Sequence, residues 1–337
     1  MSALQMSFRP LLSAIAVAGV LTAAATAEAE TLRKDQMLNG VTMTQAQCAA
    51  IQQAVWVNAY GHDFCVRYYL STAGGEGRRP VVFLQGDQFG PLDGKSFTWK
   101  DTSGAHDVDT ADLMSFADSF SKMAKTTAIY LARIGVDGSS GDHRSRKTLL
   151  ELRLMDVALE AIKRRHGFEG FHLVGQSGGS QLLAALIGMR QDIACAVAGS
   201  GQFLTSNMTG DPGRAYFDSS KYIPEVARRQ SVRLMIVTDQ TDKQVPAKMQ
   251  NAYVEKFRKA GRAVPQFNVE ATDDKHHGVV QYTRLAAAGC VLGKSDAEID
   301  RAIQTVVKRA RDFNAQKERE AQAKTRMSSG ERSDKRS

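Results

Sequence analysis

The segment 175–179 reads Gly-Gln-Ser-Gly-Gly, which places Ser177 between glycines in a Gly-x-Ser-x-Gly string. The string alone is a weak signal, but the apolar run 171–174 precedes it and a helical pattern begins directly after the serine. A strand, a sharp turn and a helix in this order lift a serine hydroxyl above a sheet, where it acts as a nucleophile. The glycines have no Cβ and let the strand and the helix approach closely. We therefore expect Ser177 to be a catalytic nucleophile.

A nucleophilic serine needs a base to take its proton, and histidine commonly serves. Five of the seven histidines precede Ser177, whereas the base follows the nucleophile in the chain order that accompanies this turn. Only His276 and His277 remain, and they come directly after the last expected strand. We favour His277, because a glycine and then an apolar residue follow it, as at the start of a packed helix. His276 stays the alternative.

The imidazole in turn needs a carboxylate to hold its tautomer and orientation. Two aspartates, Asp239 and Asp242, come at and after the end of the strand expected at 231–239. We favour Asp242, which lies in a turn before Val-Pro and the next helix, beside the histidine loop. Asp239 is closer to the strand end and stays the alternative. The predicted triad, in chain order, is Ser177, Asp242 and His277.

The elements that must position these residues alternate between strands and helices of ten or more residues. This alternation predicts an α/β fold with a parallel sheet and helices on both faces. Residues 31–55 look helical or irregular, with a short helical stretch and a turn in 49–64. Strands are expected at 65–71, 78–86, 126–133, 168–175, 196–199, 231–239 and 266–272. Helices are expected at 108–125, 146–166, 177–190, 247–260, 279–289 and 295–312.

Three motifs in order resemble the α/β-hydrolase superfamily: the Gly-Gln-Ser-Gly-Gly turn, Asp-x-x-Val-Pro at 242–246, and His-His-Gly at 276–278. The resemblance covers roughly residues 65–312 and implies the α/β-hydrolase fold, with a mostly parallel central sheet flanked by helices. It implies a serine esterase or a catalytic domain similar to that of prolyl oligopeptidase. The stretch 130–144 also resembles a loop of these enzymes in which an arginine precedes a turn rich in glycine and serine. The chain departs from the common pattern at Asp239, where many members have glycine.

Acyl transfer also needs N–H donors for the oxyanion of the tetrahedral intermediate. We expect one oxyanion-hole donor to be the Gly178 N–H, at a helix N-terminus where the helix dipole favours negative charge. The resemblance places the second in the turn 85–88, at the N–H of Gln88 or Asp87, and we favour Gln88. The Asp87 carboxylate would oppose a nearby oxyanion unless its side chain turns away.

The amino-acid composition excludes some classes of protein. The chain of 337 residues is 43% hydrophobic and 24% charged, so it has the apolar material for a sizeable core and is not mainly disordered. Its net charge is +8, but no basic run with interleaved aromatics occurs outside the C-terminal tail, which argues against nucleic-acid binding. The tail 314–337 has Met327 as its one large apolar side chain, and we expect it to be disordered. The expected hydrolase domain is 28–313.

The N-terminal segment has the features of a signal peptide. Arg9 precedes an apolar stretch that ends in small residues at 25–27, and the stretch is short for a membrane span. We expect 1–27 to be cleaved, which would give a periplasmic or secreted protein with no stable membrane insertion. An uncleaved anchor is the alternative.

Export changes the interpretation of the four cysteines. An oxidising compartment would allow Cys48 and Cys65 to form a disulfide. Cys195 and Cys290 lie in apolar segments, where both a bridge and two buried thiols remain open. The spacing of the four is not that of a zinc site.

The long connection 199–230 predicts a small cap over the site. Its aromatic residues either form an apolar wall, opposite the loop 87–107, or pack the cap on the body. A mixed apolar pocket favours esters of modest size.

Three functions from different classes follow. We expect an exported serine hydrolase that cleaves carboxylic esters through an acyl-enzyme. A serine peptidase or amidase without a propeller domain is the second candidate, and a non-catalytic binding protein on the same scaffold is the third. The partner would be a small-molecule ester or a short peptide. The chemistry is complete with protein groups, so no metal or organic cofactor is implied, and the sequence indicates no oligomeric state.

Overall fold

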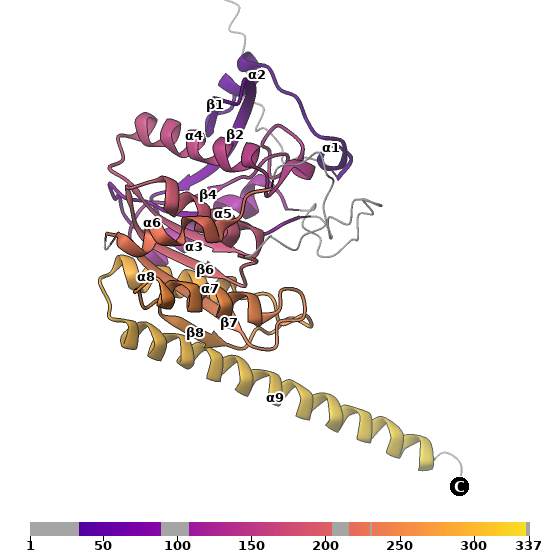
Figure 1. The fold of residues 1–337 in the computed structure, drawn as a ribbon. Helices are drawn as coiled ribbons and strands as arrows, with labels where there is room; N and C mark the ends of the chain where they lie inside the picture. Colours follow the sequence, from indigo (N-terminus) through magenta and orange to yellow (C-terminus); the bar gives the residue numbers. More distant parts are fainter. Residues whose placement is uncertain (1–33, 89–107, 204–215, 230, 335–337) are drawn as a thin grey trace, which may run out of the picture.

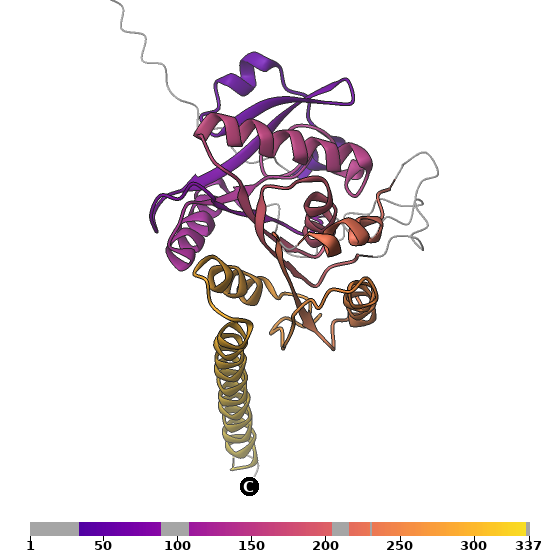
Figure 2. The same ribbon diagram turned by 60° about the vertical axis from the view of Figure 1, so that its left-hand side comes forward.

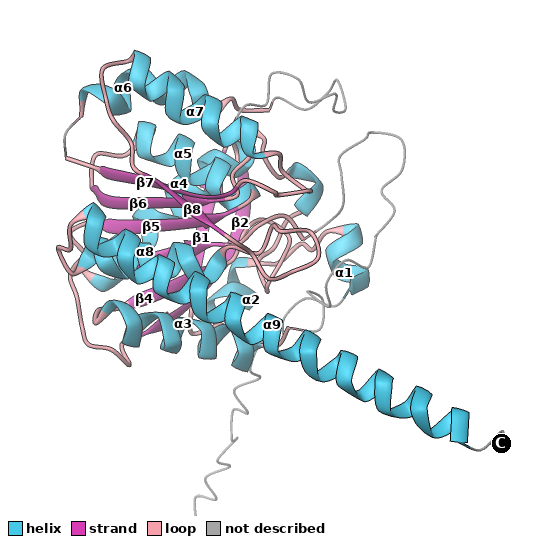
Figure 3. Ribbon diagram, turned by 90° about the horizontal axis from the view of Figure 1, so that it is seen from below, coloured by secondary structure: helices cyan, strands magenta, loops and turns pink. Residues whose placement is uncertain are grey.

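The computed structural model describes residues 34–88, 108–203, 216–229 and 231–334. The expected signal peptide, most of the loop 87–107 and the middle of the expected cap lie outside these described residues. The described part forms three layers, with a sheet between two layers of helices (Figures 1 and 3).

The central sheet has eight strands in the order β1-β2-β4-β3-β5-β6-β7-β8. β1 and β2 form an antiparallel pair at one edge, and β2 is also antiparallel to β4. Every pairing from β4 to β8 is parallel, as the alternation of strands and helices predicts. The strands are β1 (Ala54–Ala59), β2 (His62–Ser71), β3 (Val81–Leu84), β4 (Ala128–Leu131), β5 (Phe171–Gln176), β6 (Ile193–Gly199), β7 (Arg233–Asp239) and β8 (Gln266–Val269).

Helices cover both faces of this sheet. Apolar side chains of the strands pack against each layer and form two clusters, one on each face. One layer holds α4 (Leu149–His166), α5 (Gly178–Met189), α6 (Ile223–Arg228) and α7 (Ala247–Lys259). The other holds α3 (Thr110–Ala124), α8 (Val280–Val291) and the first part of α9 (Asp296–Asp334). The short elements are α1 (Lys34–Asn39), α2 (Gln45–Ala49) and the 3₁₀ helices η2 (His143–Ser145) and η3 (Ser219–Tyr222).

The hairpin of β1 and β2 differs from the prediction. The sequence pattern suggested a short helical stretch and a turn in 49–64, whereas residues 54–59 form a strand at the sheet edge. Val55 pairs with Val66, and the turn between the strands places Tyr60 and Gly61 at φ 50° and 82°. Two consecutive residues with positive φ are typical of tight hairpin turns, and Gly61 adopts this conformation without strain. The small apolar residues that resembled a helix belong to a half-buried strand.

The C-terminal helix α9 also differs from the prediction. Its first part packs Ile299, Ile303 and Val307 into the body, but the helix continues to Asp334, through most of the tail that we expected to be disordered. Beyond the body it projects as a straight rod (Figures 1 and 2). This part is rich in Ala, Gln, Glu, Lys and Arg, which have high helix propensity.

Two disulfides bridge all four cysteines. Cys48–Cys65 joins α2 to β2, which is the expected pairing. Cys195–Cys290 joins β6 to α8, so of the two alternatives for these residues the structure has the bridge. Two bridges and no free thiol are typical of an extracytoplasmic compartment. Within the described residues, no helix has the length and apolar character to cross a membrane.

The described ends of the expected cap pack on the body. Phe203 and Phe217 are buried in the core, and the Phe203 ring stacks on Tyr253 of α7 with 4.1 Å between ring centroids. Of the two roles open for these aromatic residues, Phe203 and Phe217 have the packing role.

Candidate active site

Ser177 lies at the turn between β5 and α5. Its backbone angles are φ 52° and ψ −117°, a combination that is costly for a residue with a side chain and that is common at functional sites. The Ser177 N–H donates to the carbonyl of Gly199 at 2.8 Å. A Cβ at Gly179 would lie 2.1 Å from the carbonyl oxygen of Leu84, and one at Gly175 would lie 2.7 Å from the Gly179 backbone. The strained turn therefore depends on both glycines.

The loops after β7 and β8 bring Asp242 and His277 together. His277 Nδ1 lies 2.8 Å from Asp242 Oδ2. The Asp242 side chain is fully buried, and its Oδ1 accepts the N–H groups of Gln244 and Val245, both at 2.8 Å. Because a carboxylate accepts hydrogen bonds, Nδ1 carries the proton and Nε2 is the basic nitrogen of the neutral ring. Nε2 is buried and has no hydrogen-bond partner among the described residues.

Contacts between loops place this pair beside the serine turn. The side-chain amide of Gln176, the residue before Ser177, donates to the carbonyl oxygen of His277 at 2.7 Å. The loop after β3 approaches from the other side, since a Cβ at Gly86 would lie 3.2 Å from Ser177 Cβ. Parallel strands all present their carboxyl ends at one edge, and the loops after β3, β5, β7 and β8 meet there.

The alternative residues form a second, looser pair. His276 Nδ1 lies 3.6 Å from Asp239 Oδ2, which is longer than a hydrogen bond. Asp239 instead accepts three hydrogen bonds, from the N–H and hydroxyl of Thr241 and from the Ala271 N–H. His276 lines a separate cavity of about 670 Å³ between the ends of β7 and β8 and helix α9. Of the two possible pairs, His277 and Asp242 are within hydrogen-bond distance, whereas His276 and Asp239 are not.

Of the N–H groups considered as oxyanion donors, that of Gln88 already makes a hydrogen bond. The first N–H groups of a helix have no intrahelical acceptor, and Gly178 is the first residue of α5. The Gln88 N–H, by contrast, donates to His143 Nε2 at 3.3 Å. His143 Nδ1 lies 2.9 Å from the carbonyl oxygen of Ile134, so Nδ1 carries the proton and Nε2 accepts. Burial, together with Arg133 and Arg146, holds the pKa of His143 well below its usual 6.5 and keeps the ring neutral.

The Asp87 carboxylate is surrounded by cations. It lies 2.9 Å from Arg133 Nη1, 2.6 Å from Lys147 Nζ and 3.4 Å from Arg146 Nε. Burial alone would raise the pKa of Asp87, but Lys147, Arg133 and Arg146 outweigh it and hold that pKa well below its ordinary value. One sign of this cluster is visible in the sequence: the arginine before a glycine- and serine-rich turn in 130–144. The sequence did not indicate that four charged side chains would meet there.

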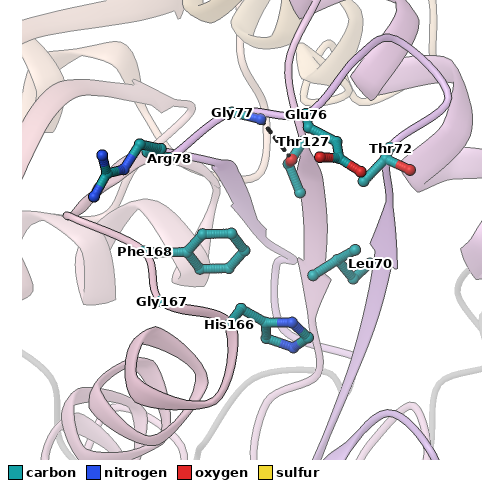
Figure 4. A pocket seen from close by; sticks show the side chains of 9 residues that line it. All are labelled: Leu70, Thr72, Glu76, Gly77, Arg78, Thr127, His166, Gly167 and Phe168. Carbon is teal, nitrogen blue, oxygen red and sulfur yellow. Dashed lines mark hydrogen bonds between the residues drawn. The ribbon is translucent and has the colours of Figure 1, made fainter.

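Among the described residues, another hollow lies away from Ser177, Asp242 and His277. At the opposite edge of the sheet, Leu70, His166 and Phe168 line a hollow of about 340 Å³ (Figure 4). His166 Nε2 there lies 2.8 Å from the Tyr68 hydroxyl. Within the described residues, no group of three or more His, Cys, Asp or Glu side chains is placed to hold a metal ion.

Comparisons with known proteins extend these observations. No protein-family model matches the sequence, and no curated protein matches it. An esterase of Pyrococcus furiosus superposes with a TM-score of 0.52 at 10% identity, over 77% of this chain and 98% of that one. The Est1E structure from Butyrivibrio proteoclasticus with bound ferulic acid gives 0.48 at 11% identity, over 72% and 99%. An acylaminoacyl peptidase of Pyrococcus horikoshii gives 0.48 at 12% identity, over 69% and 38%. At such identities the likeness concerns the fold alone.

Proposed function

We propose that this chain, which has the α/β-hydrolase fold, is a serine hydrolase that cleaves carboxylic esters of modest size. Ser177 is the nucleophile, His277 the general base and Asp242 the group that orients it. The observation that carries the proposal is the 2.8 Å contact from Asp242 to His277 Nδ1, which leaves a buried, basic Nε2 at the edge of the sheet where Ser177 turns. Hydrogen bonds between nucleophile and base are often longer in free enzymes and shorten when substrate binds.

The proposed reaction has two halves. His277 Nε2 takes the proton of Ser177 as the hydroxyl oxygen attacks the ester carbonyl carbon, and the carbonyl oxygen becomes an oxyanion. The intermediate collapses when the carbon–oxygen bond to the alcohol breaks and His277 returns the proton to the leaving alcohol. Water then attacks the acyl-enzyme by the same steps and releases the acid.

Two backbone N–H groups are proposed to bind the oxyanion. Gly178 is one, at the N-terminus of α5. The sequence favours Gln88 as the second donor, but the Gln88 N–H donates to His143, so the Asp87 N–H is the better candidate. Each such donor commonly contributes about 3 kcal/mol to transition-state stabilisation.

An oxidising location is part of the proposal. All four cysteines are bridged, and the segment 1–27 has the pattern of a cleaved signal. We therefore place the mature protein in the periplasm or outside the cell.

Active-site labelling tests the proposal directly. A fluorophosphonate probe should modify wild-type protein at Ser177 and leave the Ser177→Ala variant unmodified, with both proteins folded by circular dichroism. A folded wild-type protein that resists the probe would contradict the enzyme assignment. p-Nitrophenyl esters of increasing acyl length, compared with aminoacyl anilides, then separate an esterase from a peptidase. A higher kcat/KM on the anilides would favour the peptidase.

A further inference from the structure

A buried ion network joins the loop after β3 to the elements beside it. Arg133, just after β4, donates from Nε and Nη2 to the two oxygens of Glu151 at 2.8 and 2.9 Å. Its Nη1 donates to Asp87 Oδ1 at 2.9 Å and to the carbonyl of Gln85 at 3.1 Å. Arg133 and Glu151 are almost completely buried. The arginine therefore links the first turn of α4 to both the backbone and the side chain of the loop after β3.

Among the described residues, three cations (Arg133, Arg146 and Lys147) face two carboxylates (Asp87 and Glu151) in a region that is almost closed to solvent. Buried ion groups are weak sources of stability, because the cost of removing them from water offsets much of their mutual attraction. A contribution to stability is thus a poor explanation for such a network. The position of the network in the fold suggests a functional role instead.

The network touches the serine turn. A Cβ at Gly178 would lie 2.1 Å from Asp87 Oδ1, so the carboxylate packs directly on the first residue of α5. Gly178 and Asp87 are also the residues whose N–H groups we propose as oxyanion donors. One side chain therefore connects the two backbone segments that must lie at a fixed spacing.

We propose that Asp87 is a positioning residue, whose carboxylate, held by Arg133 and Lys147 against Gly178, sets the spacing of the two oxyanion donors. This inference rests on the proposed function. Donors act best at about 2.7–3.1 Å from the developing oxyanion. A small shift of the loop therefore weakens the binding of the transition state more than the binding of the ester.

Asp87→Asn tests the proposal, because it keeps the shape of the side chain and removes its charge. We expect kcat on a p-nitrophenyl ester to fall about 10-fold or more, as for loss of oxyanion stabilisation, with KM changed less than about twofold. Asp192→Asn is a matched control. Asp192 is held by Arg190 and Lys163 at 2.7–2.9 Å, but it precedes β6, at the edge of the sheet opposite Ser177. It should lose a comparable amount of thermal stability and keep the wild-type kcat.

Lys147→Gln is the second variant, for the case in which Asp87→Asn does not fold. It removes one cation from Asp87 and leaves the Arg133 contacts, and kcat should fall about three- to tenfold. A Lys147→Gln protein with wild-type kcat would overturn the inference. So would an Asp87→Asn protein that loses no more kcat than Asp192→Asn, or that loses activity through KM alone.

The proposed function and the positioning role of Asp87 can be tested separately. If wild-type protein neither reacts with the fluorophosphonate nor hydrolyses any ester, the proposed function and this inference both fall. If wild-type protein does both while Asp87→Asn matches the Asp192→Asn control, the inference alone is wrong.

Discussion

Two histidine–aspartate pairs lie next to each other in this molecule, built from the same two loops and from neighbouring residues. In one pair the imidazole and carboxylate are 2.8 Å apart, and in the other they are 3.6 Å apart. The side chain of His277 is 11% exposed, whereas that of His276 is 37% exposed and His276 has a positive φ of 54°. The residue types are identical, so the difference arises from the backbone of the loops.

The carboxylates explain the difference further. Asp242 uses one oxygen for two backbone N–H groups and offers the other to His277. Asp239 uses both oxygens to hold the backbone, one for Thr241 and one for Ala271. An aspartate at the end of a strand can therefore be a structural support while its neighbour three residues later is placed to act on a base.

Replacing each histidine in turn by alanine should reveal the largest functional difference between the two pairs. His277→Ala should lower kcat/KM on esters about 10⁴-fold or more, because it removes the proposed base for Ser177. His276→Ala, the matched control, should stay within about threefold of wild type. Steady-state kinetics on one p-nitrophenyl ester measure both, and an inactive His276→Ala protein beside an active His277→Ala protein would reverse our assignment.

Substitutions of the two aspartates should have different effects, one on activity and the other on stability. Asp242→Asn should lower kcat about 10³- to 10⁴-fold, since the amide no longer fixes the tautomer of His277. Asp239→Asn should lower the melting temperature while kcat stays within about tenfold, because Asp239 holds the backbone after β7 and β8. Thermal unfolding and kcat, measured on both variants, give the comparison. Equal losses of kcat in the two would show that the pairs are not functionally distinct.

A substitution in the turn that carries both histidines should have a smaller effect on kcat. Asp273 accepts the N–H of His277 at 3.1 Å and that of Gly278 at 2.7 Å. Asp273→Ala should loosen the turn and lower kcat about three- to tenfold, as for a slight misplacement of the base. Asp274→Ala changes the next residue, which is also exposed, and should leave kcat unchanged. A larger effect from Asp274→Ala would contradict this role of Asp273.

A third histidine gives the smallest effect, on stability. The pKa of His143 in the folded protein is well below 6.5, so below about pH 6.5 the unfolded chain binds a proton that the folded protein does not. The free energy of unfolding should therefore decrease as pH falls through this range, by at most about 1.4 kcal/mol per pH unit from this group. His143→Gln should remove that part of the slope in urea titrations between pH 5 and 7. An unchanged slope would show that His143 does titrate in the folded state.

The sequence was most informative where one residue type has few alternatives. The glycines around Ser177 and the two histidines after the last strand identify the segments that the structure brings together, and the alternation of strands and helices predicts the layered fold. The sheet-edge strand at 54–59 was missed because its small apolar residues also fit a helix. The ion network around Asp87 was missed because its members come from separate loops with no common spacing.

The disulfide between Cys195 and Cys290 affects how the protein must be prepared. The 95-residue segment that it closes carries Asp242 and His277 and leaves Ser177 outside. Closing a loop of that size restricts the unfolded chain by about 4–5 kcal/mol in the chain-entropy view. Material from a reducing cytosol, or samples stored with dithiothreitol, would lose that restraint on the segment that carries the proposed base and its aspartate. Esterase assays should therefore use oxidised protein purified without reductant.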